Sequence, residues 1–282
     1  MSIASPNIAG VFRQLPFEQY LGMPGVSKHE LDLVSRSPAH LQASKESPPE
    51  VTASMQFGTA AHAWILEPDR APDEVVVAPK VDRRTKAGKE AWAQFEMLAG
   101  KRVVVSEEDA HHLSKMAAAV QSHKLAGKLI RQASEIEVSC QWLDERTETM
   151  CRCRPDAISG KFIIDLKTTF DASRHAFANT THKYRYHVQA AYYLEGCKQL
   201  GLVDDDAQFL FIAVERKPPY GVAIYALGLD DLERGRFQYE RDLTRYAHCT
   251  KSGNWFGYTE TIDYIDLPFY ARKEIDQLTG NE

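Results

Sequence analysis

The sequence lacks the features that would place it in or across a membrane. No apolar run approaches the ~18 residues that a membrane-spanning helix requires. The N-terminus also lacks the charged and then apolar order of a secretory signal. Five cysteines, an odd number scattered along 282 residues, form no disulfide framework. We therefore expect a protein of a reducing cytoplasm with no membrane association.

An excess of positive charge is also absent, because the formal net charge is −5. Such a chain has no general attraction for polyanions, so a nucleic-acid surface would have to be a local basic patch. Internal repeats, low-complexity tracts and obvious linkers are missing as well. With 44% hydrophobic residues, a chain of this length can bury the core of one large domain.

Hydrophobic periodicity and capping signals predict the elements of this domain. Residues 1–26 are expected to be irregular and 44–49 to form a loop, and Ser27 with Glu30 predicts a capping box at a helix start. Helices are predicted at 27–37, 57–66, 85–98, 107–121 with further turns to 130, 182–200 and 230–248. Strands are predicted at 75–77, 103–105, 209–215 and 222–227, and as a meander at 136–143, 149–158 and 162–167. This order predicts an α/β fold around one mixed sheet.

Two acids and a lysine lie at the ends of the last two meander strands, which a tight turn at Ser159-Gly160 joins. Asp156 and Asp165 flank this turn, and Lys167 leaves the same strand face as Asp165. Carboxylates are the ligands that Mg²⁺ prefers. The ammonium could orient or deprotonate an attacking water, or stabilise the charge that develops on a phosphate. The segment therefore indicates metal-dependent hydrolysis of a phosphodiester.

The Asp-x-Lys triplet alone is weak evidence. With this composition, chance gives roughly two acid-x-Lys triplets, and the sequence has two. The second, Glu215-Arg216-Lys217, is interpreted as the charged end of an ordinary strand. A simple ion pair at a strand end explains Asp165 and Lys167 equally well. Such pairs are common at protein surfaces, and many of them contribute nothing measurable to stability.

Two helices supply further candidates for the same site. Gln189 and Tyr193 are four residues apart and share a helix face, where they could hold a phosphate or a base edge. A half-buried core tyrosine is the alternative. His62 lies among small residues and is either an interior histidine or an imidazole ligand, which would add Mn²⁺ tolerance to Mg²⁺. The backbone carbonyl of Leu166 is a further candidate ligand.

Together these residues resemble the phage-type exodeoxyribonuclease VIII family, the RecE C-terminal nuclease domain of the PD-(D/E)XK superfamily. The resemblance runs from about Val26 to Pro268. Its motifs are VSKHEL (26–31), SPAH (37–40), FGTAAH (57–62), LEP (66–68), DRRTKAGK (82–89), CRPD (153–156), IDLKTT (164–169) and YHVQAAYY (186–193). Each motif is weak on its own, but the ordered set is specific. The wider superfamily often has Glu at the position of Asp165.

The resemblance implies a fold, a domain division and an activity. The fold would be a PD-(D/E)XK core, a central mixed sheet flanked by helices, with an N-terminal helical portion. One nuclease domain would span 27–282, with a mainly helical part at 27–134, the catalytic sheet and helices at 135–250 and a tail at 251–282. The activity would be that of a bacterial or phage-encoded exonuclease that digests double-stranded DNA 5′→3′ and leaves 3′ single-stranded tails. Such enzymes form rings, here a trimer or tetramer, and work beside a single-strand annealing protein of the RecT type.

Carried over by position, the resemblance assigns roles to residues. His62, Asp156 and Asp165 would bind metal, Lys167 would be catalytic, and Gln189 and Tyr193 would support the site. Glu137 could add a carboxylate, although Glu135 competes for that position. The relatives that hold an iron–sulfur cluster need four cysteines, usually near the C-terminus. Here only Cys249 follows Cys197, so we expect no cluster.

Contacts with DNA are expected from basic residues. Arg83, Arg84, Lys86 and Lys89 open a helix and could contact backbone phosphates, although a solvated helix start explains them equally well. Arg36 is a weaker candidate for a 5′-phosphate. Two other functions stay open: an endonuclease of the same fold, as in restriction or repair, and a non-catalytic DNA-binding protein.

Overall fold

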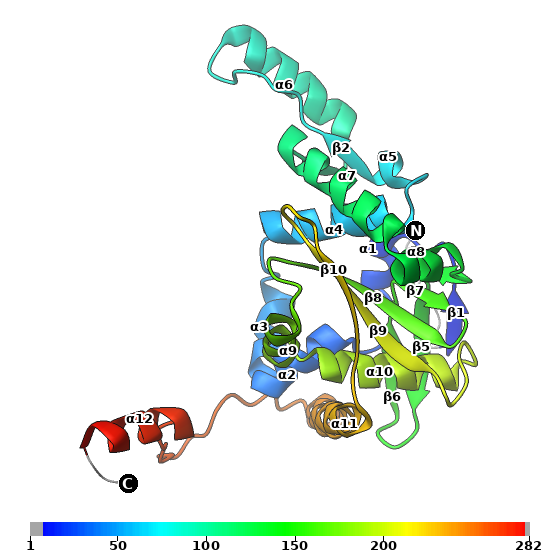
Figure 1. Ribbon diagram of the computed structural model, residues 1–282. Coiled ribbons are helices and arrows are strands. Elements are labelled where there is room, and N and C mark those ends of the chain that lie inside the picture. Colours follow the sequence, from blue (N-terminus) through cyan, green and yellow to red (C-terminus); the bar gives the residue numbers. More distant parts are fainter. Residues whose placement is uncertain (1–7, 280–282) are drawn as a thin grey trace.

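The computed structural model describes residues 8–279, and a five-stranded mixed sheet forms its centre (Figure 1). In the order β10-β9-β8-β7-β4, the strands are Val222–Ala226, Gln208–Glu215, Phe162–Thr169, Ala157–Ser159 and Glu135–Ile136. β8 and β9 run parallel, and the other neighbouring pairs are antiparallel. The predicted α/β fold with a mixed central sheet is confirmed.

Helices cover both faces of this sheet because its central strands are apolar on both sides. Along β9, Phe209 and Phe211 belong to one buried core and Leu210 and Ile212 to the other. The first core is closed by α10 (Tyr186–Gln199) and α11 (Leu229–Ser252), and the second by α4 (Ala53–Leu66), α7 (Glu107–Ser122) and α8 (Lys124–Arg131). Full burial of one such side chain stabilises the fold by about 1.5–3 kcal/mol.

The predicted meander is wrong in one respect, because its first two long strands are each broken and shared between two sheets. β5 (Ser139–Asp144) and β6 (Thr149–Cys153) pair with β1 (Gly10–Phe12) in a separate three-stranded sheet. Glu137 has a positive φ of 49°, which turns the chain between β4 and β5. Pro155 has no N–H with which to continue a ladder between β6 and β7. The two breaks lie beside the residues that later form the site.

A cluster of thiols fills the core between the three-stranded sheet and α10. Cys151 and Cys153 are fully buried. The sulfur atoms of Cys140, Cys153 and Cys197 lie within 4.8 Å of one another in apolar surroundings. Small buried thiols pack as hydrophobic side chains in such a core.

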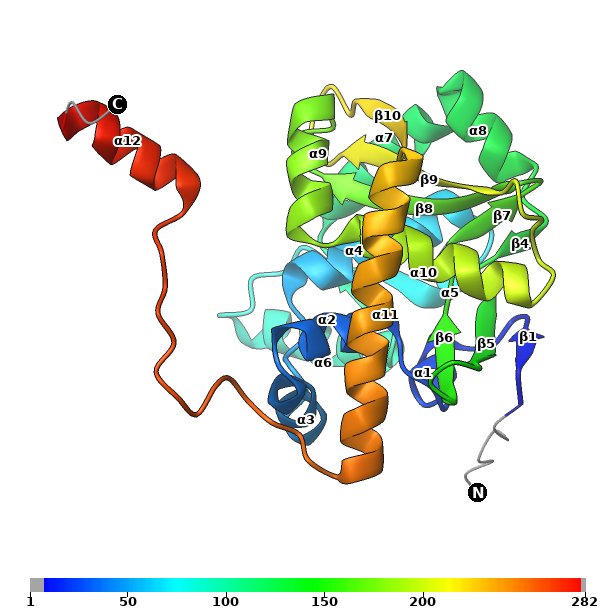
Figure 2. The same ribbon diagram turned by 90° about the horizontal axis from the view of Figure 1, so that it is seen from below.

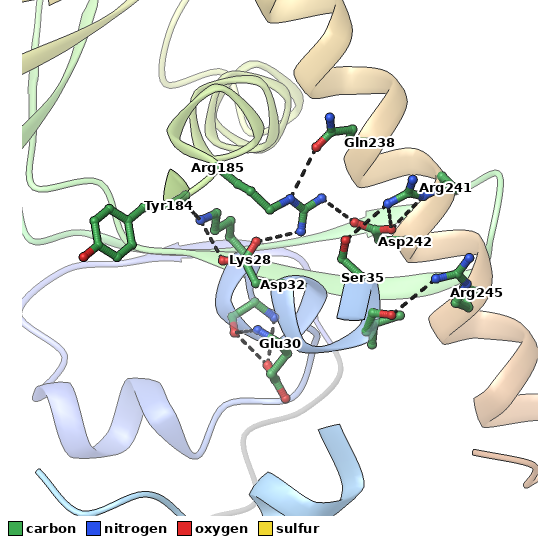
Figure 3. A network of polar contacts seen from close by, with 12 residues as sticks. Lys28, Glu30, Asp32, Ser35, Tyr184, Arg185, Gln238, Arg241, Asp242 and Arg245 are labelled. Carbon is green, nitrogen blue, oxygen red and sulfur yellow. Dashed lines mark hydrogen bonds and ion pairs between the residues drawn. The ribbon is translucent and has the colours of Figure 1, made fainter. Parts of the chain in front are cut away.

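The predicted helix over 182–200 is present as α10 but begins later, and a helix that was not predicted, α9 (Arg174–Lys183), precedes it. Arg185 separates them in a left-handed conformation with φ 54°. Its guanidinium donates to Asp32 on α2 (Lys28–Arg36) at 2.8 Å and to Asp242 on α11 at 2.5 Å (Figure 3). Asp242 has no exposed surface and also accepts from Arg241. This network joins three helices and fixes the start of α10.

The N-terminal part combines local signals with long-range pairing. The capping box at Ser27 and Glu30 is confirmed at the start of α2. α3 (Pro38–Glu46) extends into the predicted loop at 44–49. The expected irregular segment 1–26 contains β1 and α1 (Phe17–Leu21), and its residues 1–7 lie outside the described residues.

The remaining part of the chain includes two projections. The predicted strands β2 (Val75–Val77) and β3 (Val103–Val105) pair in parallel beyond the short α5 (Ala71–Glu74), and α6 (Lys86–Ala99) between them stands away from the body (Figure 1). At the other side, an extended segment and α12 (Phe269–Thr279) leave the body after α11 (Figure 2). Within residues 8–279, no helix has the length and apolar character needed to cross a bilayer.

Candidate active site

The register of the β7–β8 hairpin brings two acids opposite each other. Ser159 pairs with Phe162, so the turn is Gly160-Lys161, one residue later than predicted. Continued past Ala157 and Ile164, the same register places Asp156 across from Asp165. Both acids are buried, and Asp165 is only 2% exposed.

The end of β7 explains why Asp156 turns toward β8. Pro155 precedes Asp156, and β7 begins only at Ala157. The Leu166 N–H on β8 therefore has no strand partner on this side and donates to Oδ2 of Asp156 at 2.6 Å. The carboxylate thus replaces a backbone carbonyl and is held beside β8 at the start of β7.

His62 on α4 contacts both the backbone of β8 and the carboxylate of Asp156. Its Nε2 lies 3.0 Å from the Leu166 carbonyl oxygen. Its Nδ1 lies 3.4 Å from Oε1 of Glu137 and 3.5 Å from Oδ2 of Asp156. Within 8–279, donor atoms of His62, Glu137 and Asp156 all lie within 4.8 Å of one another. The structure therefore brings together three of the residues expected to bind metal, together with the Leu166 carbonyl.

The electrostatics of this cluster favour a bound cation. Burial raises the pKa of Asp156 to about 7 against the opposing charge of His62, and the charges of Asp165 and Glu137 act in the same direction as burial. Burial alone would lower the pKa of His62, but the carboxylates of Asp156 and Glu137 raise it to about 9. Two buried carboxylates, an imidazole and a carbonyl are donors that Mg²⁺ or Mn²⁺ accepts. The donor set thus fits a divalent cation, which would take the place of the proton on the imidazole of His62.

Asp165 faces a different set of partners. Its Oδ2 lies 2.6 Å from Nζ of Lys167, and its Oδ1 accepts from Nε2 of Gln189 at 2.5 Å. Lys167 also lies 4.6 Å from the ring centre of Tyr186, a residue that the sequence did not single out. Although burial alone would lower it, the pKa of Lys167 is raised because Asp165 pairs with it. Lys167 is therefore a fixed cation at neutral pH.

Tyr193 lies on the wall of a cavity of about 630 Å³ that opens beside the cluster. Its ring contacts Phe209 edge-on at a centroid distance of 6.0 Å, as expected of a half-buried core tyrosine, and its contact with a substrate stays a prediction. His62, Glu137 and Asp156 line the same cavity. A substrate in this cavity would meet all three.

Arg154 is a residue of the site that sequence reasoning missed. Its Nε donates to Oε2 of Glu137 at 2.8 Å, and its Nη1 donates to the Ser139 hydroxyl at 2.7 Å and the Leu15 carbonyl at 2.9 Å. Glu135, the competing acid, accepts from Arg13 and not from His62. The signal in the sequence was the position of Arg154 inside the CRPD motif, directly before the break at Pro155 and Asp156 between β6 and β7.

The basic residues expected to contact DNA do not line this cavity. Arg83, Arg84, Lys86 and Lys89 lie at the start of the projecting α6. Arg84 is paired with Asp82 at 2.9 Å, and Arg36 on α2 donates to the Tyr258 hydroxyl at 3.2 Å.

Comparison with known proteins gives one family and one similar fold. Residues 27–268 match the PDDEXK-like domain of unknown function (DUF3799). No curated protein matches the chain. A crystal structure from Eubacterium rectale, of a protein with a provisional exonuclease assignment, aligns over 95% of this chain and 99% of its own, with a TM-score of 0.57 and 13% identity. A second structure, SSO0001, aligns over 83% of this chain and 81% of its own at 15% identity, and its TM-score of 0.34 is too low to indicate a shared fold.

Proposed function

The chain belongs to the family of PDDEXK-like domains of unknown function (DUF3799), and we propose on this premise that it is a metal-dependent nuclease. One observation carries the proposal. The β7–β8 hairpin sets Asp156 across from Asp165, with His62 and Glu137 on one side and Lys167 on the other. A buried group of acids beside a fixed ammonium suits the hydrolysis of a phosphodiester better than it suits a structural ion pair.

The residues divide the chemistry between a binding group and an activating group. His62, Glu137, Asp156 and the Leu166 carbonyl would hold Mg²⁺ or Mn²⁺, with Asp165 as a further carboxylate. A bound divalent cation polarises a phosphoryl oxygen and lowers the pKa of water.

Lys167, which pairs with Asp165, would act on the phosphate of the substrate. Because its pKa is raised, it stays protonated and serves as a cation that stabilises charge on the phosphate, which favours this role over that of a general base. Gln189 would hold Asp165 in the orientation that faces Lys167. Tyr193 would contact the substrate from the cavity wall.

The substrate that we propose is double-stranded DNA with free ends. The resemblance to the exodeoxyribonuclease VIII family supports digestion in the 5′→3′ direction to leave 3′ single-stranded tails, and a RecT-type annealing protein would take up these tails. The provisional exonuclease assignment of the Eubacterium rectale protein supports attack at ends. An endonuclease of the same fold is the second candidate, because the geometry of the acids and Lys167 serves either mode.

Linear and covalently closed circular duplexes of one sequence separate these two functions. We expect Mg²⁺-dependent release of label from the 5′ end of the linear duplex, a persistent 3′ label, no cutting of the circle and no activity with EDTA. Nicking or linearisation of the circle would show an endonuclease. Binding without cleavage in Mg²⁺ and in Mn²⁺ would contradict the catalytic proposal.

A further inference from the structure

The C-terminal arm, residues 258–279, is apolar and almost uncovered. α12 has no buried side chain, and Tyr264 and Ile265 are 90% and 93% exposed. Large apolar side chains that are exposed along the arm are Tyr258, Ile262, Tyr264, Ile265, Leu267, Phe269, Tyr270, Ile275 and Leu278. Such aromatic and aliphatic side chains offer on the order of 1,000 Å² together. A monomer rarely leaves so large an apolar surface in water, so the arm fits a covered position.

The α6 projection, residues 80–102, is the second element that its own chain leaves uncovered. Met97 is 85% exposed, and Leu98 beside it is also exposed. Trp92 and Phe95 form an adjacent pair with ring centres 5.4 Å apart. α6 stands away from the central sheet (Figure 1). It therefore presents an apolar and aromatic helix surface without a partner helix.

The two projections carry opposite charge. The arm has five acidic and two basic residues, and the α6 projection has seven basic and three acidic residues. The arm acids are Glu260, Asp263, Asp266, Glu274 and Asp276, and none of them forms an ion pair within residues 8–279. Lys86 and Lys89 on α6 are exposed and have no ion-pair partner among the described residues either. Complementary charge of this kind steers and orients a contact between two surfaces.

The two projections point away from each other on one chain. In Figure 1 α6 rises above the body while α12 extends to its lower left, and the two helices are also apart in Figure 2. The arm is also anchored to the body at its start, where the Phe256 carbonyl accepts from Ala39 N–H at 3.1 Å and Tyr258 contacts Arg36. An arm held in this way cannot lie on α6 of its own chain without leaving the position that the structure shows.

We propose that the C-terminal arm of one copy docks on the α6 projection of a second copy. The apolar side chains of the arm would cover Met97, Leu98 and the aromatic pair of α6, and the arm acids would face Lys86 and Lys89. The proposal does not depend on the nuclease function. It assigns the basic start of α6 to a contact between copies, in place of a contact with DNA.

Such a contact joins two different surfaces, so a pair of copies keeps one free arm and one free α6. A heterologous contact of this type repeats until a ring closes, or continues as a filament. The docked arm would therefore link each subunit of an assembly to the next. A closed assembly would have as many arm contacts as subunits.

Two charge-reversed variants of the full-length protein test the contact by sedimentation velocity. One carries Asp263→Lys and Asp266→Lys in the arm, and the other carries Lys86→Glu and Lys89→Glu in α6. All four side chains are exposed, so folding should be unaffected. We expect wild-type protein to associate at micromolar concentration. Each variant should raise the dissociation constant about 100-fold, because like charges would then face each other.

Mixing the two variants should restore the assembly, since the basic arm of one then meets the acidic α6 of the other. A matched control with Lys115→Glu and Lys124→Glu, on the exposed surface of α7 and α8, should associate as wild type does. A monomeric wild type, assembly in both reversed variants or a mixture that stays dissociated would overturn the proposal. Normal assembly of the α6 variant with lost affinity for duplex DNA would overturn it in favour of a DNA surface.

Discussion

The substitution Arg154→Lys tests whether Glu137 is a metal ligand held in place by a neighbouring residue. Arg154 donates from Nε to Glu137 and from Nη1 to Ser139 and Leu15, and all three distances lie between 2.7 and 2.9 Å. A lysine keeps the positive charge but has a single nitrogen that cannot reproduce the planar fork. Glu137 would then lose its fixed orientation toward His62.

The magnitude follows from the role of Arg154 as a partner of a ligand. Removing the residue that orients a metal ligand lowers metal affinity about 10- to 100-fold, or about 1.4–2.7 kcal/mol. The substitution keeps the positive charge at position 154, so the electrostatic repulsion between this residue and the bound cation changes little. We therefore expect the change to come from geometry, with Mn²⁺ binding weakened in this range.

Calorimetric titration with Mn²⁺ measures this effect directly. The matched control is Arg13→Lys, because Arg13 pairs with Glu135 on the neighbouring strand and its side chain is mostly exposed. We expect the control to bind Mn²⁺ as wild type does. Wild-type affinity in Arg154→Lys would show that Glu137 is not a ligand, or that Arg154 does not hold it.

Two further predictions concern catalysis and stability. Gln189→Ala removes the donor to Asp165 and should slow single-turnover cleavage about 10- to 100-fold, whereas Gln199→Ala near the exposed end of the same helix should not. Equal rates in the two variants would contradict the role of Gln189. Asp242→Ala removes the fully buried carboxylate that pairs with the largely buried guanidinium of Arg185 and should destabilise the protein by about 3–5 kcal/mol. This loss corresponds to a fall in Tm of roughly 10 °C by calorimetry. Asp231→Ala, which breaks an exposed pair, should leave Tm unchanged, and an equal fall there would refute the buried-network argument.

Local signals predicted the parts of the fold that depend on local physics. The capping box at Ser27 and Glu30 satisfies helix N–H groups within one turn, so it could be read from four residues. The central strand β9 was found because its apolar run is buried on both faces. Elements of this kind need no knowledge of the rest of the chain.

Long-range pairing decided the parts that were missed. β1 forms because it finds β5, more than a hundred residues away, and its own sequence carries no strand signal. The break between α9 and α10 depends on Arg185, whose left-handed backbone is stabilised by Asp32 and Asp242 from two other helices. Such partners are visible only once the helices are packed.

The candidate site shows the same division. Asp156, Asp165 and Lys167 could be named because one hairpin brings them together, and the structure does so within a register shifted by one turn residue. Glu137 could not be separated from Glu135, because the positive φ that turns it toward His62 is a property of the folded chain. Arg154 was missed because its three acceptors come from separate segments.

If the β7–β8 hairpin carries a metal-dependent hydrolytic site, DNA digestion must depend on the carboxylate of Asp165. Single-turnover digestion of an end-labelled linear duplex with Mg²⁺ would compare wild type, Asp165→Ala and Asp171→Ala, with Tm recorded for each protein. Asp171 follows the same strand but is exposed and hydrogen-bonded to Ser173 N–H. We expect Asp165→Ala to stay folded and lose digestion, and Asp171→Ala to retain it. Full digestion by Asp165→Ala would show that this hairpin is not the catalytic site.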